Sequence, residues 1–242
     1  MSISSSAPWF NFYGSMPRSI DYPRTTLYTQ IAQTARQYPN DTAYEFMNRR
    51  TSYAQLLQRI DRAALALQSL GIRKGDRVTV CMPNTPQAVD CFYALSRLGA
   101  VSNMIHPLSA PQEITFYLDV SHSKAILTLD RFFGKVSGAA AKAKQPPLLL
   151  IARIEDALSL PMRLGYSLTA ARKYPKLQKS GYVLWSDALK NASGRLAAPD
   201  ADYAGCASIL YSGGTSGKTK GICLSSYNFN ALALQTIAAS GD

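Results

Sequence analysis

The sequence has few histidines and no paired cysteines. Its 242 residues include two histidines and four cysteines, and no Cys-x-x-Cys spacing occurs. A structural zinc site needs about four Cys or His ligands in close clusters, so we predict no metal site formed by these residues. The spacing is also atypical of a disulfide framework, and we interpret the cysteines as free thiols in a reducing compartment. They are Cys81, Cys91, Cys206 and Cys223.

Long apolar segments are missing as well. No apolar run approaches the ~20 residues that span a membrane. The first residues, MSISSSAPWFNFY, lack the basic start and apolar core of a secretory signal. We therefore expect a soluble cytoplasmic protein. Charged residues make up only 17% of the chain, and 47% of its residues are apolar. This composition argues against intrinsic disorder and is sufficient for a substantial hydrophobic core.

Negative charge is scarce. Lys and Arg number 26 against 15 Asp and Glu, for a net charge of +11, which favours a polyanionic ligand. Much of this excess falls in residues 131–180, with ten basic and two acidic residues. We interpret its apolar and basic part, residues 157–182, as a solvated insertion, with peripheral contact to an anionic membrane as the alternative. No recognised nucleic-acid-binding module surrounds it, so we predict no nucleic-acid partner.

The order of apolar segments indicates the fold class. Residues 1–24 resemble an extended arm whose aromatic side chains cover apolar surface. A helix over 25–36, a strand over 43–48, a turn at Arg49-Arg50 and a helix ending at Gly71 follow. Short apolar strands then alternate with helices, one starting at Pro86 and one with a Ser109/Gln112 capping box. This alternation predicts an α/β fold, a mainly parallel sheet flanked by helices. The expected strands are 77–83, 101–106, 124–130 and 146–152.

Residues 211–221, YSGGTSGKTKG, carry the clearest functional pattern. Glycines let backbone N–H groups turn toward a ligand, small hydroxyls donate hydrogen bonds, and lysines neutralise charge. Apolar strands flank the loop, which argues against a mobile linker. We therefore predict a loop that binds a phosphate chain. We expect Cys206 and Cys223, on those apolar strands, to be core thiols rather than nucleophiles. The candidate ligands are Ser212, Gly213, Gly214, Thr215, Ser216, Gly217, Lys218 and Lys220.

The loop differs from the phosphate loop of the P-loop NTPases. That motif needs four residues between its two glycines and leads directly into a helix. Here three residues separate Gly213 from Gly217, and an apolar strand follows Gly221. A P-loop would depend most on Lys218. The order strand, loop, strand favours another class of nucleotide-binding site.

The loop resembles the phosphate-binding motif [ST]-[SG]-G-[ST]-T-G-x-P-K-G of the AMP-forming adenylating enzymes, a superfamily that includes acyl-CoA synthetases. Thr219 replaces the motif's proline, which loosens the loop, and Ser226 replaces a frequent histidine. The resemblance covers residues 25–234. It includes GIRKGDRV, PNTP, LSRLGAV and HPLSAPQEI, where the family usually has Asn-Pro in place of His106-Pro107.

The resemblance implies a chemistry. Such enzymes join a carboxylate to the α-phosphate of MgATP and release pyrophosphate, and a thiol, usually CoA, then displaces AMP. It implies that Thr215, Ser216 and the amides of residues 213–217 hold the β- and γ-phosphates, with Lys220 as counter-charge. We expect ATP, Mg²⁺, CoA and a carboxylic acid, such as a fatty acid, as ligands of the full-length enzyme.

The resemblance also implies missing parts. The family's adenine-binding Tyr-Gly-x-Thr-Glu segment, hinge and C-terminal domain have no counterpart in residues 25–242, which we interpret as part of the N-terminal domain. We therefore expect this chain alone to be inactive. Two alternatives stay open: a non-catalytic nucleotide-binding fragment, and an adenylation domain for an amino or aromatic acid.

Overall fold

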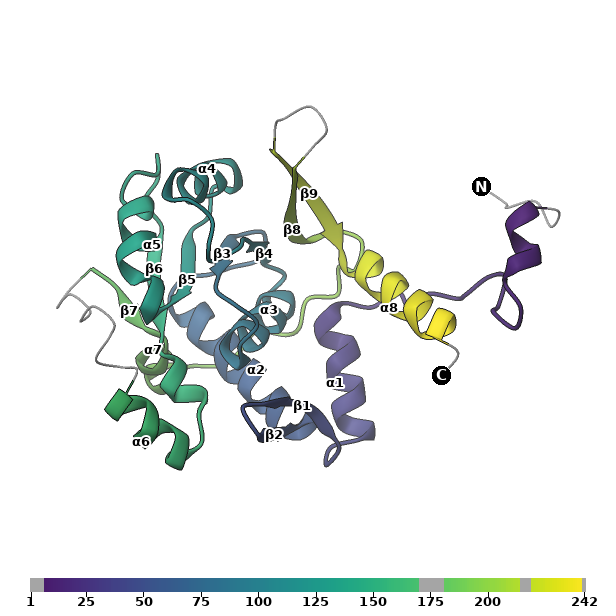
Figure 1. The fold of residues 1–242 in the computed structure, drawn as a ribbon, viewed down its shortest axis with the longest axis horizontal. Coiled ribbons are helices and arrows are strands. Elements are labelled where there is room, and N and C mark those ends of the chain that lie inside the picture. Colours follow the sequence, from purple (N-terminus) through teal and green to yellow (C-terminus); the bar gives the residue numbers. More distant parts are fainter. Residues whose placement is uncertain (1–6, 170–180, 214–218, 241–242) are drawn as a thin grey trace.

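The structure is a computed structural model that describes residues 7–169, 181–213 and 219–240 (Figure 1). Seven strands form one sheet in the order β7-β6-β5-β3-β4-β8-β9. All neighbouring pairs are parallel except β8 and β9. The predicted α/β class with a mainly parallel sheet is confirmed. The strands are β3 (Arg77–Cys81), β4 (Val101–Met104), β5 (Ala125–Leu129), β6 (Leu148–Ala152), β7 (Val183–Leu184), β8 (Cys206–Gly213) and β9 (Thr219–Ser225).

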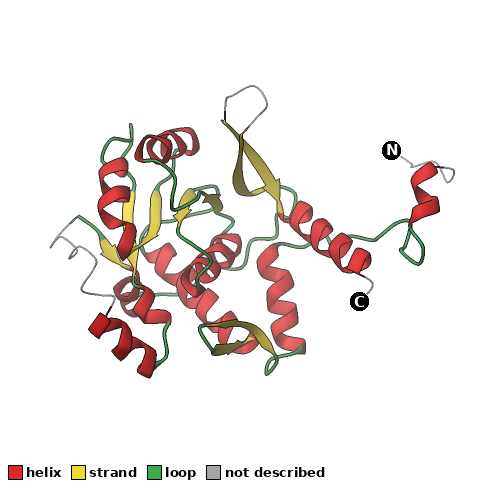
Figure 2. Ribbon diagram, in the orientation of Figure 1, coloured by secondary structure: helices red, strands yellow, loops and turns green. Residues whose placement is uncertain are grey.

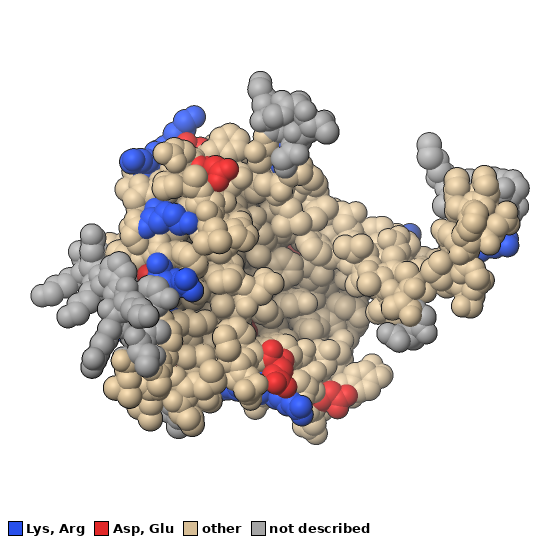
Figure 3. Space-filling view, in the orientation of Figure 1, with Lys and Arg blue, Asp and Glu red and all other residues tan. Residues whose placement is uncertain are grey.

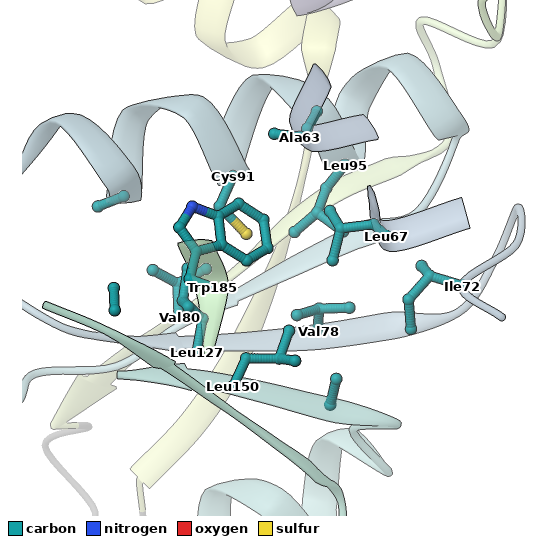
Figure 4. Packing of buried hydrophobic residues seen from close by; sticks show 14 of the residues in the cluster. Ala63, Leu67, Ile72, Val78, Val80, Cys91, Leu95, Leu127, Leu150 and Trp185 are labelled. Atoms are coloured by element: carbon teal, nitrogen blue, oxygen red, sulfur yellow. The ribbon is translucent and has the colours of Figure 1, made fainter. Parts of the chain in front are cut away.

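Helices cover both faces of the sheet (Figure 2). On one face, α2 (Tyr53–Ser69), α3 (Pro86–Leu98) and α7 (Trp185–Asn191) bury a core around Leu67, Leu95 and Trp185 (Figure 4). On the other face, α4 (Pro111–Ser121) and α5 (Phe133–Ala140) pack on β5 and β6. Every residue of β5 is buried, which explains its nearly continuous apolar sequence, because a strand covered on both faces needs no polar side. Its one polar residue, Thr128, donates a hydrogen bond to the Cys81 carbonyl (2.7 Å).

The first described part of the chain lies beside the sheet. The arm contains a short 3-10 helix (Pro8–Phe12), and α1 (Leu27–Gln37) packs on α2 and α3. The arm runs along α8 (Ser226–Ser240), where Gln235 donates a hydrogen bond to the Tyr22 hydroxyl (2.8 Å). The expected cover by aromatic residues is wrong for Phe12, whose side chain is 85% exposed. Figure 1 shows the short 3-10 helix of the arm projecting beyond the end of α8.

Two local predictions are also wrong. The turn between β1 (Thr42–Phe46) and β2 (Arg49–Ser52) falls on Met47 and Asn48, not on the two arginines. Both turn residues have positive φ, 49° and 59°, because a two-residue hairpin loop with this twist requires it.

The start of α4 is the second correction. Ala110, not Ser109, precedes the helix, and the Ala110 N–H donates to the Glu113 carboxylate (2.8 Å). Pro111 occupies the first helical position, where its missing N–H costs nothing. Gln112 therefore has no part in the cap, and the expected Ser109/Gln112 pair does not form one.

Candidate phosphate-binding site

The predicted phosphate loop connects β8 to β9. Strand β8 is parallel to β4, with Ser102 opposite Ser208 and Asn103 opposite Ile209. The Ser208 hydroxyl donates to the Ser102 carbonyl (3.1 Å), and the Ser102 hydroxyl donates to the Ala207 carbonyl (3.3 Å). This pairing brings the end of β8 to the carboxyl edge of the parallel strands. Ligands of open α/β sheets bind at that edge.

The antiparallel register brings part of the motif together. Ser212 lies opposite Lys220, and Gly213 lies opposite Thr219. Both Ser212 and Lys220 are exposed. The other predicted ligands, Gly214, Thr215, Ser216, Gly217 and Lys218, lie outside the described residues. The structure thus places one hydroxyl and one ammonium-bearing side chain across from each other at the base of the loop.

A close contact explains the glycine at position 221. Gly221 lies opposite Tyr211. A Cβ atom at Gly221 would lie 3.3 Å from Ile209 Cγ2 and 3.4 Å from Tyr211 Cε1. The Tyr211 ring also packs on the Tyr117 ring, with centroids 4.2 Å apart. The last glycine of the motif therefore leaves room for a packed tyrosine below the loop.

A buried polar network lies beneath this tyrosine. The Asn103 amide donates to the Thr79 hydroxyl (2.7 Å) and to the Ser121 hydroxyl (3.1 Å). The Ser123 hydroxyl is 2.7 Å from both hydroxyls. Burial raises the pKa of Tyr211 to about 12, although hydrogen bonds with Asn103 and Ser121 oppose the shift. Sequence reasoning missed this network, and the signal was a polar Asn103 in the middle of an apolar strand.

The cap of α8 holds the other end of the hairpin. The Asn228 N–H donates to the Ser225 hydroxyl (3.2 Å), and the Ser225 N–H donates to Asn228 Oδ1 (2.9 Å). This reciprocal cap fixes the start of α8. Ser226 is buried, and its hydroxyl accepts a hydrogen bond from the Leu27 N–H (3.3 Å). The residue that departs from the family pattern therefore contacts the start of α1.

The two cysteines of the hairpin are not core thiols. Cys206 and Cys223 are exposed, whereas Cys81 and Cys91 are buried. For Cys223 the prediction fails because β9 is the last strand of the described sheet and its central residues are exposed. Cys206 is the first residue of β8 and precedes the residues that pair with β4. Burial still raises the pKa of Cys206 to about 11, and contact with Cys223 adds to the shift.

Apolar surface surrounds the hairpin and α8. Exposed residues include Leu210 and Ile222 on the hairpin, and Leu232 and Ile237 on α8. Helix α8 contains no charged residue, and its surface is mostly tan in Figure 3. An apolar patch of this kind is typical of an interaction surface.

The described part of the chain lacks two other features. Among residues 7–169, 181–213 and 219–240, no group of three or more His, Cys, Asp or Glu side chains could hold a metal ion. No helix formed by those residues is long and apolar enough to cross a membrane.

Known proteins resemble the chain over nearly its whole length. A family model described as AMP-binding enzyme matches residues 31–241. A long-chain-fatty-acid–CoA ligase of Bacillus subtilis (strain 168) is 29% identical over 240 residues, which are 95% of this chain and 42% of that ligase. The chain thus spans less than half the length of this relative.

Solved structures share the fold. A long-chain-fatty-acid-CoA ligase from Archaeoglobus fulgidus matches with a TM-score of 0.71 and 21% identity, over 93% of this chain and 41% of that one. An anthranilate CoA ligase in complex with anthranoyl-AMP matches with a TM-score of 0.71 and 18% identity, over 92% and 38%. These two matches show the shared fold, and the family model over residues 31–241 identifies the family. The chain belongs to the AMP-binding enzymes.

Proposed function

We propose that this chain supplies the ATP phosphate-binding loop of an AMP-forming carboxylate–CoA ligase. In the first step a carboxylate oxygen attacks the α-phosphorus of MgATP, and pyrophosphate leaves as acyl-AMP forms. In the second step the CoA sulfur attacks the acyl carbon, the thiol proton is lost, and AMP leaves. The observation that carries the proposal is the pairing of Ser212 with Lys220 at the carboxyl edge of the sheet.

The loop acts on the leaving group. Negative charge builds up on the pyrophosphate oxygens as the bond to the α-phosphorus breaks, and donors already aimed at those oxygens stabilise it. We assign Lys220 as the counter-charge, and Ser212 as a hydroxyl donor across from it. The remaining donors are the hydroxyls of Thr215 and Ser216, the amides of residues 213–217, and Lys218. Mg²⁺ supplies further charge neutralisation when it is bound with ATP.

The acid is proposed to be a fatty acid. The relative from Bacillus subtilis is a long-chain-fatty-acid–CoA ligase, which supports this choice. An aromatic acid is the second candidate, supported by the similar fold of the anthranilate CoA ligase. An exchange assay with a panel of acids on an enzyme that contains this chain distinguishes the two, because only the cognate acid drives exchange of pyrophosphate into ATP.

A peripheral membrane contact would suit an apolar acid. Helix α6 (Leu160–Thr169) exposes Met162, Leu164 and Leu168, and the neighbouring residues 170–180 lie outside the described chain. We propose that residues 157–182 contact the surface of an anionic membrane from the cytoplasmic side. Co-sedimentation with anionic vesicles at low salt tests this contact, and absence of binding under those conditions would refute it.

Binding of MgATP tests the proposed role of the loop. We expect weak binding by the 242-residue chain, because it spans 42% of the relative's length. The Lys220→Ala variant should bind about tenfold more weakly or worse, as a lost charged hydrogen bond is worth about 1.5–3 kcal/mol. The exposed Lys190 on α7 offers a matched control, and Lys190→Ala should leave binding unchanged. Equal binding by all three proteins would refute the assignment. The chain alone should show no acid-dependent exchange.

A further inference from the structure

Two cysteines lie close together on the β8–β9 hairpin, away from the phosphate loop. Cys206 is the first residue of β8 and lies opposite Ser225 of β9, and Cys223 comes two residues before Ser225 on the same strand. Residues two apart on a strand share a face of the sheet. Strand β8 runs from Cys206 to Gly213, a length of about 20 Å. The two cysteines therefore lie at the opposite end of β8 from the loop, and the proposed phosphate chemistry uses neither.

The two thiols contact each other. A hydrogen bond between them is one of the causes that raise the pKa of Cys206. The Cys206 thiol also donates to the Ser208 carbonyl (3.6 Å), which helps to hold its sulfur in place. Both residues of the pair are exposed, whereas Cys81 and Cys91 are buried. A ligand can therefore reach the sulfur atoms of Cys206 and Cys223 from solvent.

Both thiols line the same cavity, which has a volume of about 280 Å³. Its other walls include Val101 at the start of β4 and Val120 near the end of α4. Among the described residues that line the cavity, Arg77 at the start of β3 is the one that carries a full charge. The Arg77 charge acts on Cys206, where it favours the thiolate form.

A pair of thiols in contact is a ligand set for a soft metal ion, because thiolate sulfur binds soft ions such as Cu⁺ and also Zn²⁺. The number of ligands separates these two ions. A structural Zn²⁺ site needs about four ligands, but no third His, Cys, Asp or Glu joins the pair within residues 7–169, 181–213 and 219–240. Cu⁺ can be held by two sulfur atoms. The expectation of no metal site rested on the ligand count of zinc and does not extend to this pair.

We propose that Cys206 and Cys223 bind one soft monovalent metal ion, with the chemistry of Cu⁺, through their two sulfur atoms. Each thiol releases its proton to solvent as its sulfur binds the ion, so two protons leave for each ion that is bound. The ion and the two thiolates together carry one negative charge, and the positive charge of Arg77 in the same cavity stabilises it. The bound ion links the two strands of the hairpin.

Competition for Cu⁺ tests the site. In the absence of oxygen, and with a chromogenic Cu⁺ chelator as the competitor, the 242-residue chain should retain one Cu⁺ per molecule. Cys206→Ser and Cys223→Ser should each weaken binding by more than about 100-fold, because a change in a residue that only supports a metal ligand already costs about 10–100-fold. The matched controls Cys81→Ala and Cys91→Ala remove buried thiols outside the pair. Each control that folds should keep the affinity of the parent for Cu⁺.

A second measurement uses the parent protein alone. Bound Cu⁺ should slow the modification of Cys206 and Cys223 by a thiol reagent by at least about tenfold, because the reagent attacks a free thiolate. Equal rates with and without Cu⁺ would overturn the proposal. A loss of less than about 100-fold in either serine variant would overturn it as well, and so would binding of Zn²⁺ as tight as that of Cu⁺, which requires more ligands than the pair provides.

The phosphate loop provides a separate control. Lys220 lies opposite Ser212 near the other end of the hairpin, so Lys220→Ala should leave the affinity for Cu⁺ unchanged even where it abolishes binding of MgATP. Conversely, Cys206→Ser should leave binding of MgATP unchanged. The metal site and the phosphate site can therefore fail independently of each other.

Discussion

Asp90 should make the stability of the protein depend on pH in an unusual direction. Its carboxyl has a pKa of 3.8 in the absence of the fold and about 6 in the buried position. Between these values the folded state holds more protons than the unfolded state, so the free energy of unfolding falls as the pH rises. A shift of this size corresponds to about 3 kcal/mol, since each pKa unit is worth about 1.4 kcal/mol.

Arg59 donates two hydrogen bonds to Asp90 Oδ2, from Nε (2.9 Å) and Nη2 (2.6 Å). Asp90→Asn removes the titration and keeps an acceptor oxygen for Arg59. Urea unfolding of both proteins between about pH 4 and pH 7 isolates the contribution of Asp90, because all other groups titrate in both. We expect the parent to lose about 2–3 kcal/mol relative to the variant over this pH range. Parallel curves would refute this reasoning. A parent that gains stability relative to the variant would show that the Arg59 pair outweighs burial.

Two further predictions concern other parts of the fold. Asn103→Ala should lower the free energy of unfolding by about 2–4 kcal/mol, since it removes two buried hydrogen bonds and leaves a cavity. The control Asn191→Ala, at an exposed position, should change it by less than about 0.5 kcal/mol. If thermal unfolding showed the same loss of stability in both variants, the role of the Asn103 network would be contradicted. A thiol reagent applied to the native protein should modify the exposed Cys206 and Cys223 well before the buried Cys81 and Cys91, and four equal rates would contradict the described hairpin.

The sheet could be predicted because most of its strands are short apolar segments that can be recognised in the sequence. Buried parallel strands such as β5 are nearly continuous apolar runs, and helix starts such as Pro86 follow from backbone geometry. The left-handed residue at Gly71, with φ of 88°, was equally predictable, because glycine adopts this conformation without a steric penalty.

Other features depend on contacts between distant segments. The Tyr211 and Tyr117 rings meet only after β8 pairs with β4. The exposure of Cys223 depends on the position of β9 in the sheet, which no local pattern gives. The misplaced cap of α4 has a different cause. Serine is the better N-cap residue, but Pro111 is favoured at the first helical position, and this makes Ala110 the residue before the helix.

The phosphate site was predictable in composition but not in geometry. The mixture of glycines, hydroxyls and lysines indicated a phosphate ligand. The pairing of Ser212 with Lys220 came only from the register of the hairpin.

Binding of inorganic pyrophosphate tests the central claim most directly, because pyrophosphate lacks the ribose and adenine and reports on the loop alone. We predict that calorimetry detects binding to the parent chain, and that Lys220→Ala weakens it by about tenfold or more while Lys218→Ala has the smaller effect. Unchanged binding in Lys220→Ala would contradict the assignment of the β8–β9 hairpin as the phosphate site, and a larger loss in Lys218→Ala would contradict the adenylating form of the loop.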